Sequence, residues 1–218
     1  MARLRNCLKI EKAILWYLAG LVATDGCLSK DARHIDITSK DRRFLKALCA
    51  RIASNSRVCS KNVGGRPYAR VQLSNKSLYE FFLSIGLMPR KSLVLGKLAV
   101  PDTGFADFLR GVIDGDGSIR KWKHPGNKKE QWSLRIYSGS REFIGWLQKA
   151  AKRVLAVRGR LYQERRTLWT LKYGKMVLKV IARRSYYDGC FGLPRKTALA
   201  TACLASDSGW KRSKTVLK

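Results

Sequence analysis

Asp25 and Asp116 are the two residues of this sequence whose type and spacing most directly suggest chemistry. Each is the next-to-last residue of a similar nine-residue segment, LAGLVATDG at 18–26 and LRGVIDGDG at 109–117, and the offset between them is 116 − 25 = 91. Glycine after a helix is the usual left-handed stop, so both aspartates are predicted at helix C-termini. The helix dipole favours cations at that end, which makes a carboxylate a poor choice for stability. A single aspartate before glycine is typical of an ordinary turn, but the repetition favours a shared chemical site.

Two carboxylates at adjoining helix ends would repel each other, and a divalent cation would relieve that repulsion. Oxygen ligands suit Mg²⁺. Metal ions held by Asp25 and Asp116 could activate water and stabilise the leaving oxygen of a phosphodiester. The backbone carbonyls of Thr24 and Gly115 are further candidate ligands, whereas Ala23 is not one. We therefore predict a metal site between the two segments, with Asp25 and Asp116 as its catalytic carboxylates.

The two segments belong to a longer internal duplication. Residues 39–48 match residues 138–147 through shared Ser, Arg, Phe and Leu positions at an offset of 138 − 39 = 99. Residues 88–92 resemble residues 193–197 at an offset of 193 − 88 = 105. An offset that grows in steps is what insertions into the loops of a duplicated fold produce. The predicted organisation is an N-terminal half at 1–92, a linker at 93–103, a C-terminal half at 104–207 and a basic tail at 208–218.

Hydrophobic periodicity predicts the same order in both halves: helix, hairpin, helix, hairpin, helix. In the first half we expect helices near 9–24, 40–53 and 77–85, with strands around 34–38 and 68–73. In the second half we expect helices near 105–114, 141–155, from 175 onward and 195–205, with strands near 118–123, 132–137, 157–163 and 168–173. We expect an α+β fold class, a pseudo-symmetric duplicated αββαββα arrangement whose two antiparallel β-sheets form a saddle-shaped binding surface with the helices packed behind.

Gly20 and Gly111 lie in the middle of the two predicted leading helices, where glycine costs about 1 kcal/mol relative to alanine. That cost is explained if the two helices must approach closely. Ala19 and Gly115 also leave little side-chain volume on the facing surfaces of the two helices. Arg110 interrupts this surface, and we expect its side chain to point away from the contact between the helices.

The two nonapeptides, at domain spacing and each followed by the same periodicity, resemble the signature helices of single-chain (two-motif) LAGLIDADG homing endonucleases, and the resemblance covers nearly the whole chain. It implies a site-specific double-stranded DNA endonuclease whose metal-dependent phosphodiester hydrolysis cuts both strands across the minor groove and leaves 3′ overhangs. The expected cofactor is Mg²⁺. Mn²⁺ or Ca²⁺ can replace it for binding, and Ca²⁺ is not expected to support cleavage. Because the halves differ throughout, we expect a long, non-palindromic target and a monomeric protein.

The sequence departs from the family pattern in two places. Ala23 stands where the second motif has Asp114, so only the last acidic position of each motif is expected to be essential, and Asp114 is a weaker candidate. Arg110 stands where the signature has alanine.

The resemblance also implies basic and polar residues near the metal. Lys91 and Lys196 lie in matching Pro-Arg-Lys contexts and are candidates for stabilising developing negative charge, with a phosphate contact alone as the alternative role. Asp36 and Arg135 are candidates for the strand residue that orders water in the family.

Net charge points to a polyanionic partner. The chain has 45 Lys and Arg against 15 Asp and Glu, a net charge of +30, which would repel itself strongly without such a partner. No apolar run approaches the roughly 20 residues that span a bilayer, and charges interrupt the region where a secretory signal would lie. The six cysteines show no zinc-finger or disulfide spacing. We expect an intracellular protein (cytoplasm, nucleoid or an organelle) that binds double-stranded DNA, with no membrane contact and no small-molecule cofactor.

Basic or polar residues alternate with apolar ones along several predicted strands, so that one sheet face is left for a ligand while the other packs under the helices. A two-stranded ribbon fits the major groove of B-DNA, where arginine reads guanine and glutamine reads adenine. The candidate DNA-binding residues are Arg33, His34, Asp36, Thr38, Arg57, Lys61, Arg66, Tyr68, Arg70, Gln72, Lys121, Lys123, Ser133, Arg135, Tyr137, Arg158, Arg160, Gln163, Arg165, Arg166, Thr170 and Lys172.

Three other functions compete with the nuclease. An RNA-binding maturase acting on intron RNA would keep the basic sheets without needing both aspartates. A DNA-binding regulator that had lost catalysis would lack one of them. A ribosomal-type structural protein would not explain the duplicated glycine-containing helices. The presence of both Asp25 and Asp116 favours the nuclease.

Overall fold

The computed structural model describes residues 10–206, and the predicted tail at 208–218 lies outside the described residues. The first half contains α2 (Lys12–Thr24), β1 (Gly26–Leu28), β2 (His34–Ser39), α3 (Arg42–Arg51), β3 (Val58–Val63), β4 (Arg66–Ser74) and α4 (Lys76–Ser84). Two 3₁₀ turns, η1 (Lys91–Leu93) and η2 (Asp102–Gly104), follow in the connection to the second half.

The second half repeats this order and adds a final helix. Its elements are α5 (Phe105–Asp116), β5 (Gly117–Lys123), β6 (Glu130–Ser138), α6 (Arg141–Leu155), β7 (Arg160–Arg165), β8 (Leu168–Gly174), α7 (Lys175–Ser185) and α8 (Pro194–Ala205). The predicted α+β class and its duplicated αββαββα layout are confirmed.

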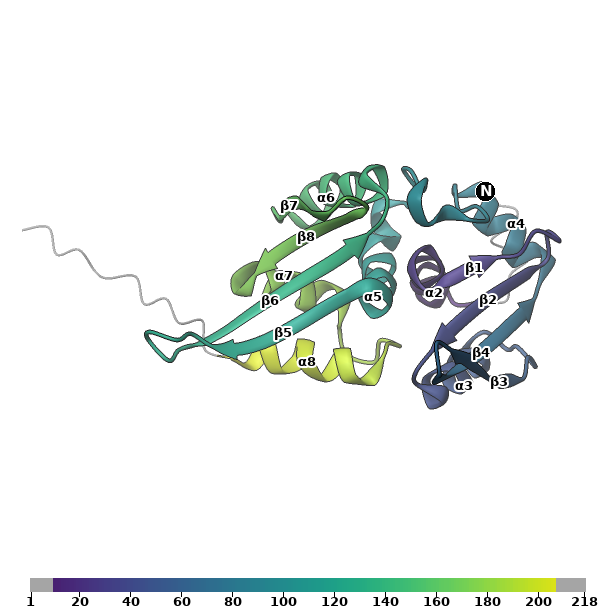
Figure 1. Ribbon diagram of the computed structural model, residues 1–218, viewed down its shortest axis with the longest axis horizontal. Helices are drawn as coiled ribbons and strands as arrows, with labels where there is room; N and C mark the ends of the chain where they lie inside the picture. Colours follow the sequence, from purple (N-terminus) through teal and green to yellow (C-terminus); the bar gives the residue numbers. More distant parts are fainter. Residues whose placement is uncertain (1–9, 207–218) are drawn as a thin grey trace, which may run out of the picture.

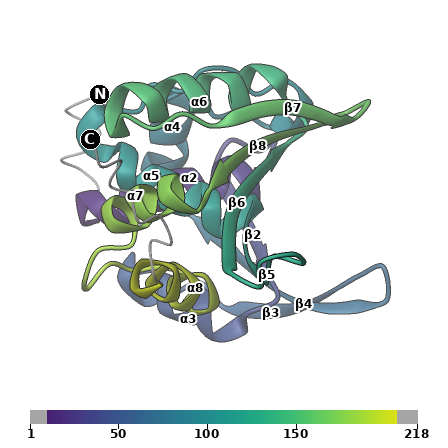
Figure 2. The same cartoon turned by 90° about the vertical axis from the view of Figure 1, so that its left-hand side faces the viewer.

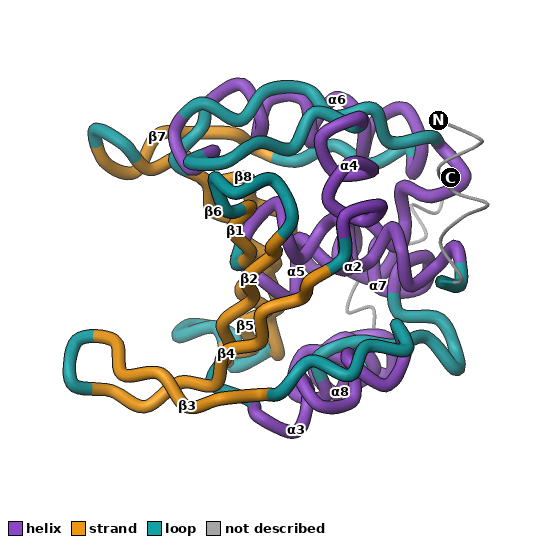
Figure 3. The backbone as a smooth tube through the Cα atoms, turned by 90° about the vertical axis from the view of Figure 1, so that its right-hand side faces the viewer, coloured by secondary structure: helices purple, strands orange, loops and turns teal. Residues whose placement is uncertain are grey.

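The two sheets have the same topology. Each is a four-stranded antiparallel sheet, with strand order β1-β2-β4-β3 in the first and β5-β6-β8-β7 in the second. Figure 1 shows them on either side of the adjacent helices α2 and α5. Figure 2 shows α6, α7 and α8 on the same side of the second sheet, and Figure 3 shows the strands of both halves gathered on one side of the molecule with the helices on the other. One broad strand surface therefore runs across both halves.

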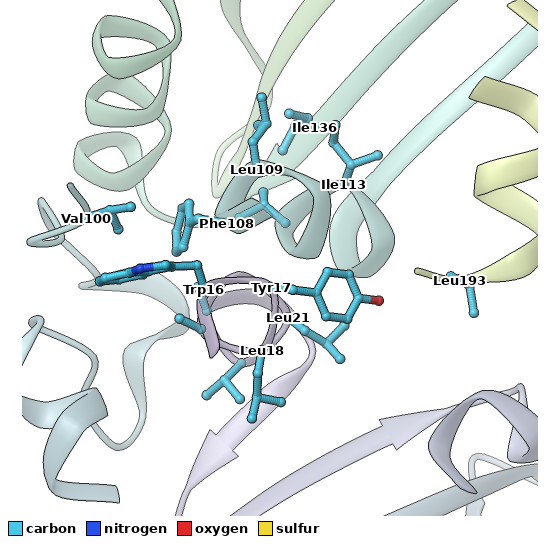
Figure 4. Close-up of a cluster of buried hydrophobic side chains, with 14 of the residues drawn as sticks. Trp16, Tyr17, Leu18, Leu21, Val100, Phe108, Leu109, Ile113, Ile136 and Leu193 are labelled. Carbon is cyan, nitrogen blue, oxygen red and sulfur yellow. The ribbon is translucent and has the colours of Figure 1, made fainter. Parts of the chain in front are cut away.

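Helices α2 and α5 pack against each other so closely that glycine is required at the crossing. A Cβ atom on Gly20 would lie 2.0 Å from the backbone oxygen of Phe108, and one on Gly111 would lie 2.0 Å from the backbone oxygen of Tyr17. The predicted reason for these two glycines agrees with this geometry. Around the crossing, Trp16, Tyr17 and Leu21 of α2 lie beside Phe108 and neighbouring α5 residues (Figure 4), so the seam is continuous with the hydrophobic core.

Equivalent caps start the second helix of each half. The side chain of Asp41 accepts a hydrogen bond from Phe44 N at 2.9 Å to begin α3, and Ser140 accepts one from Phe143 N at 3.3 Å to begin α6. Such caps typically stabilise a helix by about 1 kcal/mol. They define where α3 and α6 begin.

One predicted strand begins later than expected. The strand predicted from Val157 begins at Arg160, because Ala156 ends α6 with φ 55° and Gly159 packs so tightly that a Cβ atom there would lie 2.6 Å from the Tyr173 ring. Arg158 therefore lies in a loop and not on the strand with Arg160. No helix in residues 10–206 has the length and apolar character needed to cross a membrane.

Candidate active site and nucleic-acid interface

The C-terminal tips of α2 and α5 lie side by side. Asp25 caps α2, with its N–H donating to Leu21 O at 2.9 Å, and Asp116 is the last residue of α5. A Cβ atom on Gly115 would lie 1.9 Å from Thr24 Oγ1 and 3.5 Å from Asp25 Cγ. Only a glycine at position 115 therefore lets the two acidic ends adjoin.

The glycines after the aspartates serve a different purpose from the one predicted. Neither Gly26 nor Gly117 is among the residues with positive φ, and Gly117 has extended backbone with φ −83° and ψ 151°. Each starts a strand directly above its helix. A Cβ atom on Gly26 would lie 2.6 Å from Val22 Cα, and one on Gly117 would lie 2.5 Å from Ile113 O. The prediction of a left-handed stop was wrong, and close strand-over-helix packing explains both residues.

Both carboxylates are open to solvent yet closely surrounded by protein. Desolvation by that surrounding protein and repulsion from Asp116 raise the pKa of Asp25 to about 6, against the opposing effect of nearby lysines. Desolvation also raises the pKa of Asp116, while Lys196 and Lys91 lower it. Two carboxylates in this arrangement are ionised together at a cost that a divalent cation would remove.

Lys91 and Lys196 flank the acidic tips but are bonded differently. Both are buried. Lys196 Nζ donates to three carbonyl oxygens at the end of α5, those of Ile113 at 2.5 Å, Asp114 at 2.7 Å and Gly115 at 3.1 Å.

Lys91 Nζ donates to Gly26 O, which leaves two of its three N–H donors without a partner among the described residues. Burial lowers the pKa of both lysines, that of Lys196 to about 8. Lys196 therefore serves mainly as a cap on α5, and Lys91 is better placed to donate to a ligand.

Asp114, the weaker acidic candidate, belongs to the interior. Its carboxylate accepts hydrogen bonds from Tyr17 OH at 2.8 Å, Tyr186 OH at 2.7 Å and Leu193 N at 2.6 Å. Burial raises the pKa of Asp114. The residue ties α2, the end of α7 and the start of α8 to α5, and although it lines a cleft together with Asp25, both of its carboxylate oxygens already accept hydrogen bonds.

The expectation that Arg110 points away from the helix contact was wrong. Its side chain is fully buried, with its guanidinium 5.2 Å from the ring centroid of Tyr17 in the other half. It also donates to Phe191 O at 2.9 Å and Ser185 O at 2.7 Å, and it pairs with Asp107 at 2.7 Å. Arginine is tolerated here because Asp107 on the same helix and two carbonyls from distant segments, the end of α7 and the loop before α8, supply these partners.

The residues present fit a divalent cation that also takes ligands from outside the protein. Within residues 10–206, no group of three or more His, Cys, Asp or Glu side chains gathers as a preformed metal cage. Asp25 and Asp116 supply two adjoining carboxylates, and hard cations such as Mg²⁺ are typically held by one or two carboxylates together with water and phosphate oxygens. The carbonyl of Gly115 already accepts from Lys196, so among the two predicted carbonyl ligands Thr24 is the less engaged. Ala23 is buried within α2.

The candidate DNA-binding residues differ in accessibility. Alternation on β4 is as predicted, with Ala69, Val71 and Leu73 buried. The exposed candidates are Arg33, Arg57, Lys61, Arg66, Gln72, Lys121, Lys123, Arg158, Arg160, Gln163, Arg165 and Arg166. The half-buried candidates are His34, Asp36, Thr38, Tyr68, Arg70, Arg135, Tyr137 and Lys172.

Two candidates are buried. Thr170 is 0% exposed because its cross-strand neighbours on either side are Tyr137 and Tyr162, so the prediction that it contacts DNA was wrong. Ser133 is also buried, although it lines a shallow pocket with Arg135 and Lys172.

Arg195 is a functional candidate that sequence reasoning missed. It lies in the first turn of α8, in the second half, yet its charge lowers the pKa of Asp25 in the first. Both residues line a cleft of about 790 Å³ whose other walls include Lys40, Arg42 and Tyr68. The sequence signal for it is the matching pair of Pro-Arg-Lys segments, in which Arg90 corresponds to Arg195.

Paired acidic helix tips beneath two basic antiparallel sheets define a class of duplicated α+β proteins. A family model described as a LAGLIDADG-like domain matches residues 12–86 and 105–186. The chain belongs to this family and contains the domain twice. Among curated proteins, no sequence matches the chain significantly.

Solved structures share this fold at low sequence identity. The homing endonuclease I-WcaI bound to its DNA recognition sequence has a TM-score of 0.63 and 12% identity, covering 88% of this chain and 87% of that one. Mesophilic variants of the homing endonuclease I-DmoI give 0.57 and 15%, covering 88% and 98%.

Full-length DUF199/WhiA from Thermatoga maritima gives a TM-score of 0.58 and 17% identity over 88% of this chain. The present chain spans 60% of the length of that protein. These similarities establish the fold.

Proposed function

We propose that this chain is a site-specific endonuclease that hydrolyses one phosphodiester bond in each strand of duplex DNA. The observation that carries the proposal is the adjoining pair of solvent-open carboxylates, Asp25 and Asp116, at the tips of two pseudo-symmetric helices. Because the two halves are related by pseudo-symmetry, one acidic tip would lie near each strand of the DNA duplex. The likeness in fold to I-WcaI, whose structure holds its DNA recognition sequence, supports duplex DNA as the substrate.

Divalent cations, with Mg²⁺ as the natural one and Mn²⁺ as a substitute, would lower the pKa of a bound water molecule and stabilise negative charge at the phosphate. Asp25 and Asp116 would hold the cations, and Ca²⁺ would support binding without cleavage. Lys91, with two N–H donors left over, orients a phosphate oxygen or donates to developing charge. Lys196 holds the end of α5 in place so that Asp116 keeps its position.

The sheets supply recognition. Their exposed arginines, lysines and glutamine would lie along the major groove of each half-site, which places the acidic tips over the minor groove and gives 3′ overhangs. Because the residues of the two sheets differ, the target is long and non-palindromic. One chain carries the binding surfaces for both half-sites, so a monomer is sufficient. The protein would act inside the cell, where duplex DNA lies.

Cleavage of randomised duplexes tests this function. The full chain should cut a selected sequence with Mg²⁺ and leave it intact in EDTA. Asp25→Asn and Asp116→Asn should each reduce cleavage by at least about 10²-fold while duplex binding is kept. Asp188→Asn, an exposed carboxylate on a loop, is the matched control and should cut normally. Normal double-strand cleavage by either tip variant would refute the assignment.

The same experiment separates the two closest alternatives. A DNA-binding regulator would select a duplex sequence in both metal and EDTA without cutting it. An intron-RNA maturase would prefer structured RNA over duplex DNA in competition.

A further inference from the structure

Arg70 is held by a carboxylate on the DNA-facing side of the first sheet. It lies on β4, and Asp36 lies on the adjacent strand β2. Arg70 Nε donates to Asp36 Oδ1 at 2.8 Å, and one terminal nitrogen of the same guanidinium lies 2.6 Å from that oxygen. The side chain of Arg70 is 39% exposed and that of Asp36 22%. The carboxylate thus sits beneath the arginine and leaves its end open.

This contact fixes which donors remain. A guanidinium has five N–H donors in a planar fork, and Asp36 occupies the edge formed by Nε and one terminal nitrogen. The opposite, terminal edge keeps N–H donors on both terminal nitrogens. Two such donors in one plane match the O6 and N7 acceptors that guanine presents in the major groove. Immobilising the side chain before binding also reduces the entropy lost when the contact forms.

The second sheet has no equivalent of this pair. Strand registers place Thr38 opposite Arg70 and Tyr137 opposite Thr170, so the position of Arg70 is taken in the second sheet by the buried Thr170. The position of Asp36 is taken by Arg135, which approaches Glu164 only through one terminal nitrogen at 3.8 Å. That pair leaves the arginine loosely held. The two sheets therefore differ in side chains at these equivalent positions.

We propose that Arg70, buttressed by Asp36, reads one guanine in the half-site that faces the first sheet, and that the second half-site carries no matching guanine requirement at the equivalent position. This inference rests on the proposed duplex DNA binding, but not on cleavage.

A binding selection in EDTA tests the inference separately from the nuclease function. The full-length chain is allowed to select from fully randomised duplexes, and the bound pool is sequenced. Wild type should enrich one position in guanine by roughly 5- to 150-fold over other bases, the range for a good bidentate contact. Arg70→Ala should abolish enrichment at that position alone.

The variant Asp36→Asn distinguishes the positioning of Arg70 by the carboxylate from the general effect of the carboxylate's charge on DNA affinity. Removing the carboxylate charge favours binding to a polyanion in general, so total duplex affinity should be kept or rise. The guanine preference should nevertheless weaken, because the guanidinium is no longer held in one orientation. Arg135→Ala is the matched control from the second sheet and should leave this position unchanged.

Distinct outcomes overturn the inference. It fails if Arg70→Ala keeps every guanine preference of the wild type, if Asp36→Asn keeps the full preference, or if the chain selects no duplex sequence at all. If guanine selection depends on Arg70 but no condition yields cleavage, the inference stands and the proposed nuclease function fails.

Discussion

The carboxylate of Asp25 is less stable in its charged form than an ordinary aspartate, since desolvation and Asp116 raise its pKa to about 6. The folded state therefore binds this proton more tightly than the unfolded chain, and the folded protein loses stability as pH rises through about 4 to 6. At pH 7 without metal, Asp25→Asn should raise the melting temperature. Because the group is solvent-open, the gain should stay below about 2–4 °C. Thermal unfolding in EDTA checks this, and a lowered melting temperature would contradict it.

The same carboxylate predicts the pH dependence of the reaction. Metal binding needs the ionised form, so cleavage at subsaturating Mg²⁺ should rise between about pH 5 and pH 7 as Asp25 loses its proton. Raising the Mg²⁺ concentration should shift the midpoint to lower pH, because the cation favours the ionised form. Initial rates measured over a grid of pH and Mg²⁺ check this. A midpoint that does not move with Mg²⁺ would show that another group limits the rate.

Lys91 and Lys196 occupy equivalent sequence contexts but should behave differently when neutralised. Lys196→Met removes the donor to three carbonyls of α5 and should cost about 1–3 kcal/mol of stability. Lys91→Met loses one such bond and should cost about 1 kcal/mol or less, yet reduce single-turnover cleavage by roughly 10²-fold. Denaturant unfolding and single-turnover rates measure the two effects. Equal stability losses with equal rate losses would refute the distinction.

At the scale of elements, the crossing of α2 and α5 should be the part of the fold least tolerant of added atoms. Gly20→Ala would drive a methyl group to 2.0 Å from Phe108 O and should destabilise by about 3 kcal/mol or more. Gly145→Ala on α6 is the matched control, because nothing lies within 4 Å of its Cβ position, and it should stabilise by about 0.4–1 kcal/mol. Urea unfolding compares them. A tolerated Gly20→Ala would mean that the helices separate easily.

Elements and their order could be predicted from the sequence because periodicity and caps are local. Helix 141–155 was predicted with the bounds observed for α6, and the glycines at the crossing were expected to permit close approach. Contacts that depend on distant segments could not be predicted. Arg110 donates to carbonyls at the end of α7 and in the loop before α8, and Thr170 is flanked by tyrosines from two other strands.

The candidate site likewise contains residues that could be predicted from the sequence and residues that could not. Asp25 and Asp116 could be paired from the duplication alone, since two equivalent helix ends were expected to adjoin. The repeated Pro-Arg-Lys segment marks Arg195 and Arg90 as equivalent, but only the structure shows that Arg195, at the start of α8, acts on Asp25 in the other half. The internal role of Asp114 was also hidden, since its three partners lie on segments far away in the chain.

At the scale of the whole molecule, a net charge of +30 predicts binding that depends steeply on salt. If the two sheets together neutralise 6–10 phosphates, affinity should fall roughly 10³- to 10⁵-fold between 50 and 200 mM salt. Fluorescence anisotropy with a selected duplex measures the slope. A loss of less than about tenfold would mean that the basic surface does not follow the DNA backbone.

The hydrogen bond from Tyr17 to Asp114 makes the two halves unlike partners. At the offset of 91, the counterparts of these residues are Phe108 and Ala23, which have neither a hydroxyl nor a carboxylate. A homodimer of first halves would bury two phenols with no acceptor, and a homodimer of second halves would bury two carboxylates without the phenol that crosses the seam. Should the two halves be produced as separate polypeptides, mixed pairs should outcompete like pairs: a duplication that began with interchangeable copies has become an obligatory heterologous match.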